Sequence, residues 1–392
     1  MKLWDKGYGV NKSIETYTVG NDYVLDKKLV KYDCMASIAH AKMLGKIGVL
    51  DKNEVNKLTS TLNQIIDLSE KDKFDIKPED EDCHTAIENY LVSKLGAVGK
   101  KIHTARSRND QVATALRLYY KEELKSTIKD LSKLIANLEI FAKKYSNVEM
   151  PGYTHMRKAM PSSMKMWSEA FSQSLNDDKV LAENTLKLID QSPLGTGAGY
   201  GLPINVDRTL TTKLLGFTKT QESPIYTQNS RGKFEALILN TMSQILLDLN
   251  RMASDIILFS MPEFGYFELP KELSTGSSIM PHKKNPDVLE LVRSKYHQVV
   301  GYQFQVMGMS GNLISGYNRD MQLTKEPTMN GIDTTKDSIN IMGIVVNRLK
   351  VDKEACRKAM SSELYSVSEA YKLVKEGVPF RDAYKKVGKR FD

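Results

Sequence analysis

Residues 276–287 read Gly-Ser-Ser-Ile-Met-Pro-His-Lys-Lys-Asn-Pro-Asp. Pro281 and Pro286 fix their own φ angles and keep the residues before them out of helical geometry, so the chain stays extended until Pro286 opens a helix. Apolar residues then recur at helical spacing as far as Val299. The lysines and the asparagine of the run thus precede a helix start, where free N–H groups favour an anion. The run predicts either a loop that handles a carboxylate or a surface turn with solvated lysines, and turn chemistry alone does not separate them.

The charge of the chain is spread along its length. The chain has 392 residues, a formal net charge of +8 and a pI near 9.0. Lys and Arg are interspersed with Asp and Glu along helical segments and form no block, which disfavours a nucleic-acid partner. The excess of positive charge instead favours a locally positive site for a polyanionic small molecule.

Composition also bears on the compartment. Hydrophobic residues make up 41% and charged residues 27% of the chain, as in an ordinary soluble protein. Cys34, Cys83 and Cys356 are isolated, lack metal-ligand spacing and suggest a reducing compartment. The amino terminus lacks the apolar core of a signal peptide, and no apolar run approaches the ~20 residues that span a bilayer. We therefore expect a cytoplasmic protein without a membrane partner.

Long helices dominate the pattern. Residues 100–150 contain no glycine or proline, and their apolar residues step by three and four, which predicts a helix of ~35 residues, roughly 50 Å long. Similar patterns cover 162–190 and 233–261, and a fourth begins at Pro286. Strand signals are scarce, so the sequence predicts an all-α fold built on a long-helix bundle.

A polar run precedes the first long helix. Residues 103–111 read His-Thr-Ala-Arg-Ser-Arg-Asn-Asp-Gln. Arg108 and Asn109 offer a guanidinium fork and an amide, which suit a planar carboxylate, although a solvated helix start would use the same residue types. His84, in an earlier short helix, is more typical of a structural or capping histidine than of a catalytic one.

Two further polar runs interrupt the helices. Residues 150–161 hold a threonine and a histidine between prolines, on a turn expected between two helices, where a histidine more often caps a helix than transfers protons. Residues 316–327 are dense in hydrogen-bonding groups at an expected helix break and could form a surface loop. The side chains of these runs that could contact a ligand are Thr154, His155, Tyr317, Gln322 and Lys325.

These motifs together carry a family resemblance. The run at 276–287 is similar to the signature loop of the aspartase/fumarase superfamily, Gly-Ser-Ser-x-Met-Pro-x-Lys-x-Asn-Pro, at every fixed position. The chain from Val19 to Gly388 resembles the argininosuccinate lyases of that superfamily, in the same motif order. Other segments that carry this resemblance are 81–88, 103–112, 150–161, 316–327 and 373–384, and the first of them implies that His84 lies near the active site.

The resemblance implies a carbon–nitrogen lyase that reversibly eliminates argininosuccinate to arginine and fumarate, the last step of arginine biosynthesis. It implies an all-α, three-domain fold, with a helical domain at 1–106, the long-helix bundle and catalytic loop at 107–350, and a small helical domain at 351–392, shorter than in most members. It also implies a homotetramer that builds each active site from three subunits. Neither a metal nor an organic cofactor is expected.

The resemblance also assigns residue roles. Ser277 would take the proton beside a carboxylate after its loop closes, while Lys283 and Asn285 would hold the resulting aci-carboxylate. His155, oriented by Glu290, would support protonation of the leaving nitrogen. Which of His155 and Ser277 is the acid and which the base stays open at this point. The expected substrate contacts are Arg108, Asn109, Thr154, Tyr317, Gln322 and Lys325.

Some positions depart from the usual family pattern. Ala105 stands where glycine is common, Tyr384 where histidine is common, and Asp22 where many members have a substrate-contacting serine. His282 replaces the usual glutamine, and the related adenylosuccinate lyases have histidine there.

Two other functions are therefore kept as alternatives. Adenylosuccinate lyase is favoured by His282 but disfavoured by Lys284 and by the runs at 106–110 and 317–325. A non-catalytic scaffold of the lens-crystallin type is the other alternative, because the superfamily includes inactive homologues. Against it stand the retained side chains of His155, Ser277, Lys283 and Asn285.

Overall fold

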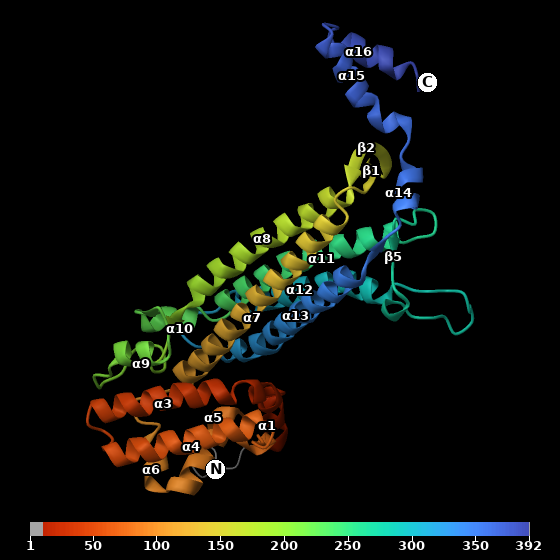
Figure 1. Cartoon of the computed structure of the whole chain (residues 1–392). Coiled ribbons are helices and arrows are strands. Elements are labelled where there is room, and N and C mark those ends of the chain that lie inside the picture. Colours follow the sequence, from red (N-terminus) through yellow and green to blue (C-terminus); the bar gives the residue numbers. More distant parts are fainter. Residues whose placement is uncertain (1–10, 392) are drawn as a thin grey trace. The chain divides into compact units, whose positions relative to one another are not determined.

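The computed structural model describes residues 11–391, and helices dominate this part of the chain (Figure 1). Its strands form three two-stranded sheets. The predicted all-α fold is confirmed. Where the sequence predicted four long helices, residues 11–391 contain five: α7 (Arg108–Lys144), α8 (Met164–Ile189), α11 (Lys233–Phe259), α12 (Asp287–Ser310) and α13 (Lys325–Arg348).

Helix α7 follows the sequence pattern closely. Its 37 residues contain neither glycine nor proline, and the apolar face expected from the sequence is buried at Leu116, Leu124, Leu131 and Leu138. No helix among residues 11–391 is long and apolar enough to cross a membrane.

Contacts within the described chain separate it into two compact units. The first comprises the residues up to Ser126 with Ala182–Asn240 and Gly301–Ile332, and the second comprises the remaining segments. Each of the five long helices contributes one part to each unit. The three-domain boundaries expected after residues 106 and 350 stay predictions.

The first unit contains a set of short helices. Helices α3 (Val30–Lys46) and α4 (Lys52–Glu70) pack against each other, and Asp51 closes a capping box with Glu54 at the start of α4. Helix α5 (Cys83–Leu95) begins at Asp82, whose carboxylate accepts a hydrogen bond from the Thr85 N–H at 2.8 Å. The other elements are α1 (Lys12–Val19), α2 (Asp22–Leu25), η1 (Asp26–Lys28), η2 (Pro78–Asp80), α6 (Ala97–Lys101), β3 (Gln191–Ser192), α9 (Arg208–Leu214), β4 (Lys219–Thr220), α10 (Pro224–Asn229) and η4 (Arg319–Thr324).

The second unit joins its portions of the long helices by polar and aromatic contacts. The Ser168 hydroxyl donates to the Leu138 carbonyl at 2.7 Å, and the Trp167 indole donates to Asp255 at 3.0 Å. Trp167 and Phe141 also meet edge to face, with ring centroids 5.8 Å apart. The other elements are β1 (Glu149–Thr154), β2 (Arg157–Ser163), β5 (Phe267–Glu268), η3 (Lys271–Leu273), β6 (Lys350–Val351), α14 (Lys353–Ala359), η5 (Ser362–Tyr365), α15 (Ser366–Lys375) and α16 (Phe380–Gly388).

A β-hairpin replaces the simple turn predicted between the first two long helices. Strands β1 and β2 pair antiparallel, with Thr154 opposite Arg157. The two residues at the tip, His155 and Met156, have φ angles of 52° and 59°. Positive φ at both central positions is the geometry of a type I′ turn, which matches the twist of a hairpin.

Candidate active site

The first unit contains an open cavity of about 440 Å³. It is lined by residues from the helix starts and loops around α5 and α7, together with the segment that leads into α13. The predicted site residues that the structure brings together on its walls are Arg108, Asn109, Tyr317, Gln322 and Lys325.

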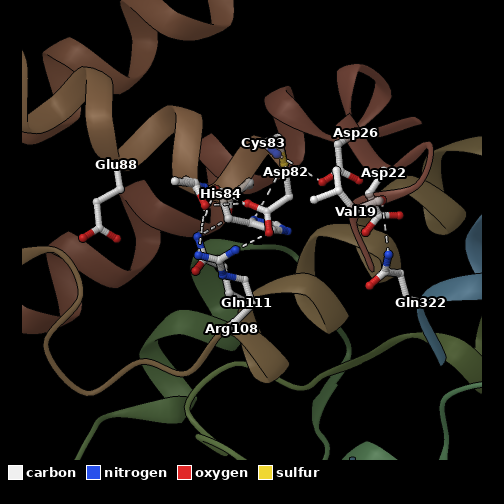
Figure 2. A network of polar contacts seen from close by, with 12 residues as sticks. Val19, Asp22, Asp26, Asp82, Cys83, His84, Glu88, Arg108, Gln111 and Gln322 are labelled. Atoms are coloured by element: carbon white, nitrogen blue, oxygen red, sulfur yellow. Dashed lines mark hydrogen bonds and ion pairs between the residues drawn. The ribbon is translucent and has the colours of Figure 1, made fainter. Parts of the chain in front are cut away.

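Arg108 is held at the cavity by the start of α5. Its guanidinium forms an ion pair with Asp82 and donates to the Thr85 hydroxyl at 3.1 Å, and Figure 2 shows Arg108 pointing toward Asp82. Burial alone would raise the pKa of Asp82, but Arg108 and His84 outweigh it and the pKa is lowered. The ion pair and the helix cap therefore fix Arg108 in one orientation.

The start of α7 also fixes the glycine-rich run that follows α8. The Asn109 amide donates to the Ala198 carbonyl at 3.2 Å. The buried carboxylate of Asp110 accepts hydrogen bonds from the backbone N–H groups of Gly195 and Gly197, both at 3.0 Å. Gly197 has φ of 60°, so the chain can make this approach without the strain that a side chain would add. Burial raises the pKa of Asp110 to about 6, even though these N–H donors lower it.

Lys325 lines the cavity with a nearly buried side chain. Its side chain is 3% exposed, and its ammonium donates to Asp26 at 2.5 Å and lies 3.2 Å from Asp22. Burial alone would lower the pKa of Lys325, but Asp26 and Asp22 outweigh it and the pKa is raised. Lys325 is therefore a permanently charged group that already has two carboxylate partners.

The segment before α13 anchors to the first helix of the unit. The Gln322 amide donates to the Thr18 carbonyl at 2.9 Å, and Arg319 donates to that same carbonyl at 2.9 Å. The guanidinium carbon of Arg231 lies 5.2 Å from the ring centroid of Tyr317. The sequence reasoning missed Arg231 and Arg319 as cavity residues. Arg319 lies inside a quoted motif and could have been found, whereas Arg231 lies in no motif.

A buried His–Asp pair underlies the same cavity. His84 Nδ1 lies 3.3 Å from Asp33, and the Gln111 amide donates to both Asp33 oxygens, at 3.0 and 3.1 Å. Burial would lower the pKa of His84, but Asp33, Asp82 and Asp26 raise it on balance. These contacts agree with the structural role expected for His84.

One group of possible metal ligands lies close by. Donor atoms of Asp26, Cys83 and His84 lie within 4.8 Å of one another. The two Asp26 oxygens already accept hydrogen bonds from Lys325 and from the Cys83 N–H, and burial raises the pKa of the Cys83 thiol well above its usual value. A thiolate ligand is therefore unfavourable here, and the donor set does not favour a metal.

The predicted catalytic loop lies in the second unit. Thr275 and Asn285 close it through reciprocal backbone hydrogen bonds of 3.0 and 2.8 Å. Inside the loop, the Ser277 Oγ accepts hydrogen bonds from the N–H groups of Ile279 and Met280, at 3.3 and 3.1 Å. The hydroxyl oxygen of Ser277 is thus held between two backbone donors.

The remaining loop residues border a second cavity. Lys283, Asn285 and Glu290 line it, and its volume is about 640 Å³. Lys283 is exposed, and the Asn285 amide donates to the Gly276 carbonyl at 3.3 Å. Glu290 lies in the first turn of α12, which begins one residue after the predicted start at Pro286.

Thr154 and His155 occupy the turn of the β1–β2 hairpin, where both are exposed. Among residues 11–391, His155 and Glu290 form no hydrogen bond with each other. The predicted His155–Glu290 pair therefore stays a prediction.

Comparison with known sequences identifies relatives over the whole chain. Residues 12–301 match the family described as Lyase. The chain is 54% identical over 391 residues to the argininosuccinate lyase of Thermotoga neapolitana, covering 100% of this chain and 98% of that protein. It is 41% identical over 387 residues to the argininosuccinate lyase of Bacteroides fragilis, covering 99% of this chain and 87% of that protein.

Solved structures share the fold at lower identity. An EDDS lyase in complex with formate superposes with a TM-score of 0.81 at 24% identity, covering 97% of this chain and 76% of that chain. The class II fumarase of Schistosoma mansoni superposes with a TM-score of 0.77 at 17% identity, covering 98% of this chain and 92% of that chain. The predicted aspartase/fumarase-like fold is confirmed.

Proposed function

We propose a mechanism for this chain from the premise that it belongs to the argininosuccinate lyase family, within the aspartase/fumarase superfamily. It is a lyase that eliminates argininosuccinate to arginine and fumarate, as the identity over the full chain supports. The same identity gives no support to an adenylosuccinate lyase or to a non-catalytic scaffold.

Ser277 is the base that removes a proton from the carbon next to the one that bears the departing nitrogen. The supporting observation is that its Oγ accepts hydrogen bonds from the N–H groups of Ile279 and Met280. Two backbone donors stabilise negative charge on a hydroxyl oxygen, which lowers the cost of ionising it. Closure of the loop over substrate would remove water and strengthen this effect.

Lys283 and Asn285 hold the aci-carboxylate that forms when the proton leaves. Lys283 is exposed and lies just before α12, so its ammonium and the positive end of that helix attract the same carboxylate. The new negative charge develops only in the transition state, and donors that meet it there accelerate the reaction more than donors that bind the substrate equally well.

His155 supports protonation of the leaving guanidinium nitrogen. It is exposed on a rigid type I′ turn, which presents its imidazole and the Thr154 hydroxyl away from the hairpin. Glu290 is exposed in the first turn of α12 and can orient such an imidazole from a neighbouring subunit. We assign the acid role to His155, because the two N–H groups that donate to the Ser277 oxygen stabilise negative charge there and so suit Ser277 to act as the base.

The remaining predicted residues bind substrate. Arg108 and Asn109 lie on the wall of the first cavity with polar atoms fixed by neighbouring groups, which suits a carboxylate ligand. Tyr317, Gln322 and Lys325 complete this wall. Thr154 would act with His155 from the hairpin.

We further propose that the enzyme is a cytoplasmic homotetramer whose subunits share active sites and whose role is arginine biosynthesis. Helix α12 supports the assembly, because it exposes large apolar side chains that a monomer would leave in water. Three of them recur at helical spacing on one face of the helix: Val300, Phe304 and Met307, which are 38%, 78% and 55% exposed.

Fumarate release, followed by ultraviolet absorbance, tests the proposal. We expect turnover of argininosuccinate but not of adenylosuccinate. Ser277→Ala should lower kcat by about 10³-fold, within the usual range for a general base. Ser278→Ala is the matched control, because it removes the neighbouring hydroxyl of the same loop and should leave kcat within about threefold. Full activity of Ser277→Ala would refute its role, and release from adenylosuccinate alone would refute the substrate.

A further inference from the structure

Tyr153 is the last partly buried residue of β1 before the exposed turn that carries His155. Thr154, His155 and the three residues after them are exposed. The register of the hairpin also shifts between Gly152 and Tyr153, as in a β-bulge. Bulges redirect side chains and are common beside active sites. The position of the His155 imidazole therefore depends on how Tyr153 is held.

The ring of Tyr153 packs into a cluster of four aromatic side chains in the second unit. Its centroid lies 5.8 Å from that of Phe259, the last residue of α11, and 6.0 Å from that of Phe264. The ring of Tyr266 contacts the same two phenylalanines, with centroids 5.5 and 5.7 Å away. This packing holds the Tyr153 ring without using its hydroxyl.

One hydrogen bond inside this aromatic cluster joins the hairpin to the segment that leads into β5. The hydroxyl oxygens of Tyr153 and Tyr266 lie 2.7 Å apart, so one hydroxyl donates to the other. Burial first and the bond to Tyr153 second raise the pKa of Tyr266, which therefore keeps its proton at neutral pH. The bond thus persists at the pH at which the enzyme works.

Tyr266 is a rigid partner for the hairpin. It is 2% exposed, and its carbonyl accepts a hydrogen bond of 3.0 Å from the Asp352 N–H. The two residues after it form β5, which pairs antiparallel with β6. The hydrogen bond from Tyr153 therefore ends at a point that the backbone already fixes.

We propose that Tyr153 is a positioning residue, whose hydrogen bond to Tyr266 holds the turn at His155 in the orientation that delivers a proton to the leaving nitrogen. This inference rests on the proposed function, in which His155 is the acid. An acid must lie within hydrogen-bond reach of the atom that it protonates, and a shift of about 1 Å can lower a rate by about 100-fold.

Removal of the carbon-bound proton should not depend on this bond. The proposed base, Ser277, is held by the N–H groups of its own loop, at Ile279 and Met280. Loss of the Tyr153 hydroxyl should therefore slow departure of the nitrogen and leave proton removal by Ser277 in place.

The two steps can be followed separately in D₂O. When Ser277 removes the proton and the nitrogen stays, a deuteron returns to the same carbon and the recovered argininosuccinate carries deuterium. When the nitrogen leaves with a proton, fumarate is released. The ratio of deuterium incorporation to fumarate release therefore rises if only the acid is misplaced. Weaker binding or less folded enzyme lowers both rates and leaves the ratio unchanged.

The experiment measures this ratio for Tyr153→Phe and Tyr266→Phe in the full-length enzyme at saturating argininosuccinate. Each change removes one hydroxyl and keeps the ring in the cluster. Each should lower fumarate release by about 10-fold and raise the ratio by at least about fivefold. The double variant should show no larger effect than either single variant, because one hydrogen bond is lost in all three.

Tyr365→Phe is the matched control. Its hydroxyl donates to Glu149 at the base of the same hairpin, but over 3.5 Å and at an exposed position. Its rate and its ratio should equal those of the wild-type enzyme within about twofold. Ser277→Ala should lose deuterium incorporation and fumarate release together, because it removes the proposed base. Unfolding midpoints show whether each variant is folded.

The outcomes separate this inference from the proposed function. An unchanged ratio in both tyrosine variants would overturn the inference, and an equal fall of both rates would indicate a structural role. A change in only one of the two variants would also overturn it, because the bond needs both hydroxyls. If the wild-type enzyme neither incorporates deuterium nor releases fumarate, the proposed function fails. Wild-type turnover with a ratio that does not depend on Tyr153 leaves the function intact and removes only the inference.

Discussion

Replacing Lys325 by methionine tests whether the charge cluster under the cavity is held by its buried cation. The ammonium of Lys325 is almost inaccessible to water, and its partner Asp26 is completely buried. Methionine has a similar volume but no charge, so the substitution leaves Asp26 and Asp22 facing each other without a cation. The two carboxyls then lack the interaction that compensates for their burial.

The structure indicates how large the effect should be. Breaking a buried ion pair by removing one partner costs about 3–5 kcal/mol of unfolding free energy. Asp26→Asn should cost less, about 1–3 kcal/mol, because Lys325 keeps its 3.2 Å contact with Asp22 and the amide oxygen can still accept a hydrogen bond. The double variant Lys325→Met, Asp26→Asn should lose at least about 1 kcal/mol less unfolding free energy than the sum of the losses in the two single variants.

The pH dependence of this loss provides an internal check. Without the cation, the pKa of Asp22 rises further above that of the unfolded chain, because burial and the neighbouring Asp26 both raise it. A carboxyl with a raised folded-state pKa stabilises the protein at low pH and loses that contribution as the pH rises. The deficit of Lys325→Met should therefore grow between about pH 5.5 and about pH 8.

Urea unfolding at a fixed protein concentration and at several pH values measures the free energy of unfolding of each variant. Lys325→Arg serves as the control, since it keeps the charge in the same place. A deficit below about 1 kcal/mol for Lys325→Met, or one that does not change with pH, would refute the view that buried charge balance holds this wall together.

Two further predictions concern stability. Gly232 has φ of 76°, and a Cβ there would lie 1.9 Å from the Ser310 hydroxyl oxygen, so Gly232→Ala should lower the free energy of unfolding by at least about 2 kcal/mol. Gly308→Ala is the control, because Gly308 lies in a helix with open space around it and its substitution should not lower the free energy of unfolding. Equal thermal unfolding midpoints for the two variants would contradict this prediction. Burial first and the neighbouring Asp248 second raise the pKa of Asp178 from 3.8 to about 7, so its contribution to stability is lost as the pH rises toward 7. Asp178→Asn should remove this loss, so that its free energy of unfolding exceeds that of the wild-type protein by at least about 1.4 kcal/mol above pH 7 and by little near pH 4. Thermal melts above pH 7 and near pH 4 measure the difference.

Four of the five long helices described above were predicted, because each of the four keeps its apolar spacing over many turns. Helix α13 was missed, because residues 316–327 were interpreted as a polar segment at a helix break. The structure places Pro327 in the first turn of a helix that begins at Lys325, where its missing N–H has no intrahelical partner to lose. The hairpin at His155 was missed for a related reason, since its prolines and glycine look like a turn and few alternating apolar residues reveal the strands.

The candidate site was predictable in its residues but not in their partners. Motifs indicated Arg108 and Lys325, because the family resemblance covers the segments that carry them. The sequence did not indicate that Asp82 pairs with Arg108 or that Asp26 lies under Lys325. These pairs join segments far apart in the chain, and only the fold brings them together.

The contrast between the two groups of cations suggests how the enzyme divides its tasks. Arg108 and Lys325 are each held by carboxylates, so their positions are fixed before substrate arrives and little side-chain entropy is lost on binding. Lys283, by contrast, is exposed on the loop, where its charge is hydrated and therefore weak. Such a cation becomes effective only when the loop closes and water leaves. In the proposed mechanism, recognition therefore belongs to the paired groups of the cavity, and the charge that stabilises the aci-carboxylate belongs to Lys283 of the loop.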